Sequence, residues 1–456
     1  PRWTDKVGRG IFSYDVTETP LTDDLHCPES AIREAQELLR QLYGADQSFF
    51  LVNGSTCGNE AMIMSAALEG EKIMIARNAH KSAMMGLILS GAKPVYVMPD
   101  LIHEWAIQGP ITARDVQKCF ELNPDCKALF LVSPSYYGVC SDLKEIADIC
   151  HAHDALLLVD EAHGGHLYFH DLLPKGVLDC GADICVQSMH KVAGALTQSA
   201  VLHIKSHGIH ESALAKVAEN LHLVQSTSPN YLLMISLDCA RYELANHGKQ
   251  MMDKALALAG YARTQIQNLP GFCCMEGHNL DMTRLVISAK ELGLTGFELD
   301  TLLFEKYAVN MELSDYENVL AIVTYANEQT DLDRLVKACE DISRTYTQKP
   351  NKKVLKIQTN IPNIPNIPLQ VMTPRQAYFS KKETIHWQDA VGKISGQMIA
   401  PYPPGIPIIY PGEQISPEVW EYIEFFRREG RHMHGTDKNG QLDYITIIKY
   451  TGGQKD

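Results

Sequence analysis

Short apolar runs alternate with helical patterns through the first half of the chain. The expected strands span residues 49–52, 72–76, 94–98, 128–132, 155–159 and 184–187. Each run is nearly continuous in apolar residues, and helical patterns lie between them, for example at residues 82–89. Apolar strands separated by helices predict a parallel sheet with both faces covered by helices.

A seventh strand is expected at residues 199–204. Too few residues separate it from the strand at 184–187 for a helical crossover, so an antiparallel pairing of these two strands is expected. The pattern therefore predicts an α/β fold with a mostly parallel, seven-stranded sheet.

The second half of the chain has a different pattern. Residues 211–268 are helical in pattern, residues 283–289 and 320–324 are expected strands, and residues 331–346 form an amphipathic helix. This order predicts a smaller α/β lobe. Polar residues and an Ile-Pro-Asn repeat at 348–369 favour an extended linker. The predicted division is a large domain at 1–275, the lobe at 276–347, the linker at 348–369 and an α+β domain at 370–456.

Composition narrows the functional classes. The 456 residues include 41 Lys and Arg against 55 Asp and Glu, a net charge of −14, which argues against a nucleic-acid-binding protein. The 12 cysteines show no Cys-x-x-Cys spacing, which favours reduced thiols and a cytoplasmic location. No run of about 18 apolar residues is found, so no membrane span is expected.

Lys191 is the first residue of chemical interest. It ends the segment Ser188-Met189-His190-Lys191, which directly follows the expected strand 184–187. Ligands of open α/β sheets bind at the carboxyl ends of strands, and a lysine held there can act as a nucleophilic amine. Taken alone, such a residue is more often an ordinary surface lysine.

Asp160 directly follows the expected strand 155–159, in the segment Asp160-Glu161-Ala162-His163-Gly164. An acid at this place is suited to pair with a buried cation such as the protonated pyridine nitrogen of pyridoxal 5′-phosphate (PLP). A metal ligand or a helix cap would explain the same residue equally well.

Two further segments follow strands. Asn53-Gly54-Ser55-Thr56-Cys57-Gly58-Asn59 lies between a strand and a helix, where hydroxyls and helix-terminal amides can bind a phosphate. It matches neither a P-loop nor the dinucleotide motif Gly-x-Gly-x-x-Gly, and an ordinary turn remains an alternative. In Asn78-Ala79-His80-Lys81-Ser82, the imidazole of His80 could stack on a flat ligand or simply cap a helix.

The four segments occur in a specific chain order, and together they resemble the fold type I PLP enzymes, which share the aspartate aminotransferase fold. Their residues are similar to those of the Orn/Lys/Arg decarboxylase family, in particular its small members. Three more segments are similar to the family: Asp23-Asp24-Leu25-His26, residues 400–407 and Pro411-Gly412-Glu413. The resemblance covers nearly the whole chain, although the Pro-Gly-His-Lys segment usual before Asp23 is not found.

The resemblance implies a role for each matching residue. Lys191 would be the Schiff-base lysine, Asp160 would pair with the pyridine nitrogen, and His163 would lie near the ring hydroxyl. His80 would stack on one face of the ring and Ala162 would pack on the other. The phosphate would be held by Ser55, Thr56, Ser188 and His190, with Thr197 reaching the phosphate of a partner subunit. Glu413 would approach the substrate, with Glu312 and Asp315 as further candidates for its cationic group.

The implied function is that of a lyase that decarboxylates arginine, lysine or ornithine to agmatine, cadaverine or putrescine, amines of polyamine biosynthesis. The implied assembly is a homodimer, or a higher homo-oligomer, with sites at the subunit interface. Another PLP enzyme of the same fold, such as an aminotransferase or a desulfurase, is the main alternative, although a transaminase usually stacks an aromatic ring where His80 stands. The remaining alternative is a PLP-binding protein without catalytic activity.

Overall fold

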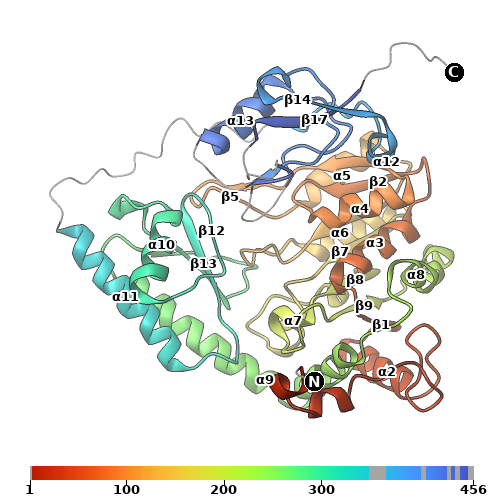
Figure 1. Cartoon of the computed structure of the whole chain (residues 1–456), viewed down its shortest axis with the longest axis horizontal. Helices are drawn as coiled ribbons and strands as arrows, with labels where there is room; N and C mark the ends of the chain where they lie inside the picture. The colour runs from red at the N-terminus through yellow and green to blue at the C-terminus, as the bar shows by residue number, and fades with distance from the viewer. Residues whose placement is uncertain (1–2, 349–365, 402–406, 429–432, 437–441, 450–456) are drawn as a thin grey trace. The chain divides into compact units, whose positions relative to one another are not determined.

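The computed structural model describes residues 3–348, 366–401, 407–428, 433–436 and 442–449. Within it the chain forms two compact units, each built from several stretches of sequence (Figure 1). The first unit comprises residues 1–67, 110–254 and 279–281, and the second comprises residues 68–109, 255–278 and 282–456.

The largest sheet has seven strands in the order β1-β9-β8-β7-β6-β2-β3. They are β1 (Gln47–Leu51), β2 (Lys72–Ala76), β3 (Lys93–Val97), β6 (Cys126–Val132), β7 (Leu156–Asp160), β8 (Ile184–Gln187) and β9 (Ala200–Ile204). β7 runs parallel to β6 and β8, and β2 runs parallel to β3, whereas β9 is antiparallel to β8 and β1. The predicted mostly parallel sheet and the antiparallel β8–β9 pairing are both confirmed.

The first unit also contains most of the helices of its half of the chain. They are α1 (Thr4–Val7), α2 (Ala31–Tyr43), α3 (Gly54–Ala66), α5 (Ala113–Leu122), α6 (Leu143–Ala152), α7 (Met189–Val192) and α8 (Glu211–Val224), followed by α9 (Tyr231–Gln267), which continues into the second unit. α3 packs against β7, β8 and β9 and also against α8. Gly58 permits this approach, because a Cβ there would lie 2.6 Å from Val186 Cγ2.

The helical pattern at residues 211–268 is divided between two helices rather than one. α8 ends at Val224 and α9 begins at Tyr231. The break contains Pro229, which restricts the residue before it to an extended conformation and lacks an amide hydrogen.

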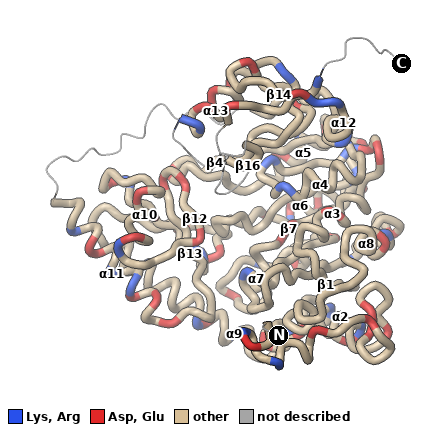
Figure 2. The backbone as a smooth tube through the Cα atoms, in the orientation of Figure 1, with Lys and Arg blue, Asp and Glu red and all other residues tan. Residues whose placement is uncertain are grey.

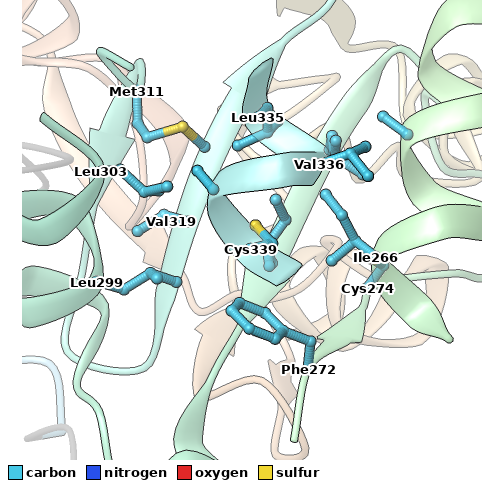
Figure 3. Packing of buried hydrophobic residues seen from close by; sticks show 14 of the residues in the cluster. Ile266, Phe272, Cys274, Leu299, Leu303, Met311, Val319, Leu335, Val336 and Cys339 are labelled. Carbon is cyan, nitrogen blue, oxygen red and sulfur yellow. The ribbon is translucent and has the colours of Figure 1, made fainter. Parts of the chain in front are cut away.

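The small lobe of the second unit has a four-stranded sheet in the order β10-β11-β13-β12. The strands are β10 (Cys273–Cys274), β11 (Arg284–Ser288), β12 (Leu313–Ser314) and β13 (Asn318–Ile322), and the helices are α10 (Gly296–Tyr307) and α11 (Gln329–Thr347). Figure 3 shows Leu299 and Leu303 of α10 and Cys339 of α11 around Val319 of β13. The predicted α/β lobe is therefore present.

The second unit also contains β2, β3, α4 (Lys81–Ser90), the hairpin β4 (Leu101–Ile102) and β5 (Ile107–Gln108), and the C-terminal elements. The last are α12 (Pro374–Phe379), β14 (Lys382–His386), β15 (Ala400–Pro401), α13 (Pro417–Arg428), β16 (Met433–His434) and β17 (Tyr444–Ile448). Trp387, Val419, Ile423 and Ile445 belong to their shared core. Most of the predicted linker at 348–369 and residues 402–406 of the Pro-rich run lie outside the described residues, and the predicted domain boundaries stay predictions.

In the described part of the chain, none of the helices combines the length and apolarity needed to cross a bilayer. Over the same residues, no group of His, Cys, Asp and Glu has an arrangement that could hold a metal ion. All 12 cysteines are free thiols.

Candidate active site

Lys191 and His163 form the centre of the site in the first unit. Lys191 lies in the short helix α7, within the turn that begins at Ser188, and its Nζ is 2.9 Å from Nε2 of His163. The ring of Tyr136 lies beside both, with its centroid 4.4 Å from that of His163 and 5.8 Å from Nζ. An amine and an imidazole at this distance can exchange a proton directly.

Asp160 is held in place at the end of β7. Its side chain is almost fully buried, and Oδ2 accepts a hydrogen bond of 2.7 Å from Nδ2 of Asn59, while Oδ1 accepts one of 3.1 Å from the Ala162 amide. Asn59 lies on α3, one turn after Ser55, so this bond connects the helix to the strand end. A buried carboxylate fixed by neutral donors is suited to a cationic partner.

The hydroxyl groups predicted to hold a phosphate gather at the start of α3. Ser188 Oγ donates a 2.9 Å hydrogen bond to Ser55 Oγ, which joins the lysine segment to this helix. Ser55 and Thr56 are partly exposed. The side chain of the N-cap residue, Asn53, makes no capping hydrogen bond, so the amides of the first turn can bind an anion.

His190 lies next to Lys191 and is about half-buried. Its Nδ1 is 3.1 Å from the carbonyl oxygen of Ser199, to which it donates. Burial, and then the charge of Lys191, lower the pKa of His190 below its ordinary value. The neutral ring would therefore have to gain a proton on its second nitrogen to donate a hydrogen bond to a phosphate.

A second layer of buried polar groups lies behind the site. Glu161 is fully buried and accepts hydrogen bonds from Gln187 Nε2 (2.7 Å), the Val177 amide (3.0 Å) and Tyr168 Oη (3.0 Å). Its carbonyl oxygen accepts from the Gly164 amide, which closes the turn that carries His163. Burial outweighs these donors and raises the pKa of Glu161 to about 8.

Thr197 lies in an exposed loop of the first unit between α7 and β9. Leu196, next to it, is 52% exposed, although it is a large apolar residue. The loop follows Gly194, and Gln198 has a φ of 84°, so the backbone turns sharply here. The structure thus does not place Thr197 beside the other phosphate residues of its own unit.

Two predicted site residues belong to the second unit. His80 is exposed and is the N-cap of α4, where its Nδ1 lies 3.3 Å from the Ser82 amide and accepts from it. Glu413 is fully buried, and both its oxygens accept from the guanidinium of Arg77, at 2.6 and 2.8 Å. Both carboxylate oxygens of Glu413 are thus engaged by Arg77, and the substrate contact expected from the sequence stays a prediction.

Of the other two acids expected near the substrate's cationic group, Asp315 is also engaged. Its Oδ1 accepts from the amides of Glu317 and Asn318, both at 2.8 Å. Glu312 is exposed.

Comparisons with known proteins show the family to which the chain belongs. The family model for the Orn/Lys/Arg decarboxylase major domain matches residues 2–284, and the model for the C-terminal domain of the same family matches residues 358–442. The chain belongs to the Orn/Lys/Arg decarboxylase family. The predictions of this family and of a decarboxylase are therefore confirmed.

Individual members of the family show how far the similarity extends. An arginine decarboxylase of Bacillus subtilis is 37% identical, and the match covers 98% of this chain and 92% of that protein. One of Halalkalibacterium halodurans is 36% identical over 96% of this chain and 89% of that protein. The solved structure of the constitutive lysine decarboxylase of Escherichia coli has a TM-score of 0.83 at 21% identity, covering 98% of this chain and 77% of that one. The last match confirms the fold.

The donor groups of this decarboxylase fit PLP. Amides and hydroxyls at the start of α3 suit the phosphate, the buried acid Asp160 suits the pyridine nitrogen, and the amine of Lys191 suits the aldehyde. The bonds Ser188–Ser55 and Asn59–Asp160 bring these groups together from α3, β7 and α7.

Sequence reasoning missed some residues of the site. Asn59 ends the Gly-rich segment, and its position four residues after Ser55 is the signal that could have found it, because this spacing places both residues on one face of a helix. Tyr136 follows the Ser133–Pro134 cis peptide in a loop whose path no local pattern indicates. Glu161 was visible in the Asp-Glu-Ala-His-Gly segment, but only its burial reveals its role as a support.

Proposed function

We propose that this decarboxylase acts with PLP as its cofactor and that arginine is its preferred substrate, ahead of lysine and ornithine. The contact between Lys191 and His163 at the strand edge that holds Asp160 is the observation that carries the proposal. The preference for arginine is supported by relatives that are 36–37% identical over nearly the whole chain and are named arginine decarboxylases. The product would be agmatine, an amine of polyamine biosynthesis.

Each residue of the site would have a defined task. When bound, PLP withdraws the electron pair left on the α-carbon as carbon dioxide departs. Asp160 would hold a proton at the pyridine nitrogen, and Ser55, Thr56, Ser188 and His190 would bind the phosphate. His80 would stack on one face of the ring, and Ala162 would pack on the other.

The proton that replaces the carboxylate would come from Lys191 or from His163. Their 2.9 Å contact lets His163 take a proton from the Lys191 ammonium and return one, so either can serve as the general acid at the α-carbon. His163 and Ala162 are both buried, which limits the access of water to this side of the site.

We further propose that two copies of the chain assemble as a homodimer, with Thr197 of each contacting the phosphate in the other. The support is the exposure of Thr197 and of the apolar Leu196 next to it. The free thiols support a cytoplasmic location. The net charge of −14 would favour attraction of a cationic substrate. The charges are not segregated by sign, since Figure 2 shows acidic and basic residues interspersed along helices such as α11 and α13.

Product analysis tests the proposal. The purified protein is incubated with PLP and with arginine, lysine or ornithine, and carbon dioxide and the amine are measured. Agmatine should form fastest. Accumulation of a keto acid without amine would replace the decarboxylase with an aminotransferase.

The Lys191→Ala variant should lose the visible absorbance of lysine-bound PLP and its fixation by borohydride. Lys144→Ala is the control, since Lys144 is an exposed lysine of α6 that pairs with Asp148. A borohydride-fixed adduct that persists in Lys191→Ala would show that another lysine binds PLP.

A further inference from the structure

Arg77 and Glu413 form a buried ion pair within the second unit. Arg77 directly follows β2 and is 4% exposed, while Glu413 is 0% exposed. Besides its two bonds to the carboxylate, Arg77 donates to the carbonyl oxygen of Ile408 at 2.9 Å. Its guanidinium carbon lies 4.7 and 4.4 Å from the ring centroids of Tyr96 and Tyr410. An arginine engaged on so many sides fixes the end of β2.

The backbone around Glu413 is fixed as firmly as its side chain. Its carbonyl oxygen accepts from the Ser395 amide at 2.8 Å, and its Oε2 also accepts from the Tyr410 amide at 2.8 Å. Gly412 has a φ of 92°, and a Cβ there would lie 2.3 Å from the carbonyl oxygen of Met372. The carboxylate is therefore presented to Arg77 by a turn that admits only glycine.

A second contact holds the far end of the same segment. Arg375 on α12 donates from Nη1 to the carbonyl oxygens of Ile88 (3.0 Å) and Leu89 (2.8 Å), at the C-terminus of α4. A cation that binds the last carbonyl groups of a helix stabilises that helix end. C-terminal residues thus hold both ends of the stretch from Arg77 to Ser90.

His80 lies between these two anchor points. The Ala79 amide donates to the carbonyl oxygen of Ala76, forming a turn that leads directly from the strand to the helix. Ser82 is fully buried, and His80 caps α4 through the Ser82 amide and is 2.9 Å from its hydroxyl. The direction of the imidazole therefore depends on how the strand end and the helix are held.

We propose that Glu413 is a positioning residue for His80, acting through Arg77, and that Arg375 secures the other end of α4. This inference rests on the proposed stacking of His80 on PLP. It gives Pro411-Gly412-Glu413 the task of orienting a cofactor-binding residue rather than of binding substrate.

Hydrogen exchange of the protein without PLP tests the anchoring itself. Glu413→Gln should increase exchange in peptides covering residues 77–90. Glu424→Gln is the matched control, because Glu424 is another buried glutamate of the C-terminal elements that binds arginines, Arg427 and Arg428, outside this segment. Unchanged exchange in Glu413→Gln, or an equal increase in Glu424→Gln, would overturn the anchoring.

A milder variant covers the case in which Glu413→Gln does not fold. Arg375 is only half-buried, so Arg375→Ala should fold and increase exchange near residues 86–90, and Arg375→Lys should restore part of the protection. If Arg375→Ala leaves this region as protected as before, α4 does not depend on α12.

PLP titration tests the connection to His80. Glu413→Gln should weaken PLP binding about tenfold, and the same change in a His80→Ala background should weaken it less than about twofold, because sites that act through one residue are not additive. Equal weakening in both backgrounds would show that Glu413 does not act through His80. If His80→Ala alone leaves PLP affinity unchanged, the stacking role is wrong, while the exchange data still decide the anchoring.

Discussion

Glu161→Gln makes a sharp test of the buried layer behind the site. The pKa of Glu161 is raised from its ordinary 4.5 to about 8, with burial as the largest cause. Between these values the folded enzyme binds a proton that the unfolded chain has lost. Stability contributed by this group is therefore fully present below about pH 4.5 and is lost as the pH rises through about 8.

The magnitude follows from the same two values. Each pH unit inside the window removes about 1.4 kcal/mol, so the whole window corresponds to roughly 5 kcal/mol. The glutamine introduced by the substitution would be neutral at every pH and would have no such dependence. Its amide has a single acceptor oxygen, which cannot accept from the Val177 amide as well as from Gln187 and Tyr168, so the variant should be less stable than the wild type near pH 5.

The assay is the melting temperature of both proteins between about pH 5 and pH 9. The advantage of the wild type should shrink by several degrees up to about pH 8 and then level off. Glu424→Gln is the control, since hydrogen bonding by Arg427 lowers the pKa of Glu424. The stability that Glu424 contributes is present above its ordinary pKa and is lost only in acid. The difference in melting temperature between the wild type and Glu424→Gln should therefore stay constant between about pH 5 and pH 9. A flat difference for Glu161→Gln would refute the reasoning.

Two further predictions concern α3. Asn59→Ala removes the hydrogen-bond donor to Asp160 Oδ2 and leaves a buried carboxylate oxygen without that partner. PLP binding, measured by fluorescence titration, should weaken about tenfold. An unchanged PLP affinity would count against a role for this contact. Gly58→Ala places a Cβ 2.6 Å from Val186 Cγ2, which should push α3 away from β8 and lower the melting temperature. Gly260→Ala is the control, because a Cβ at Gly260 meets open space and should leave the melting temperature unchanged. Equal melting temperatures for Gly58→Ala and the wild type would show that the helix adjusts without cost.

Much of the fold could be predicted because its signals are local. β2 and β8 have the predicted bounds, and the other predicted strands of the large sheet are displaced by only one or two residues at either end. The sequence also marks the break between α8 and α9, because residues 225–230 contain no apolar residue and include Pro229.

The site divides in the same way. Ser188, His190 and Lys191 follow β8 directly, and Asp160 ends β7, so strand order alone predicted that they share one edge of a sheet. The resemblance of Pro411-Gly412-Glu413 to a family segment predicts that Glu413 approaches the substrate. Its burial against Arg77 could not be predicted, since the two residues are 336 positions apart and neither has a local pattern that names the other.

The mostly parallel sheet, the chain order of the candidate site residues and the family follow from the sequence alone, because apolar runs and short motifs are properties of neighbouring residues. The contacts between side chains follow only from the tertiary structure. It paired Lys191 with His163, supported Asp160 with Asn59, and buried Glu413 against Arg77. These contacts join residues distant in sequence, and their strength depends on burial, which removes the competing water and makes every charge require a partner.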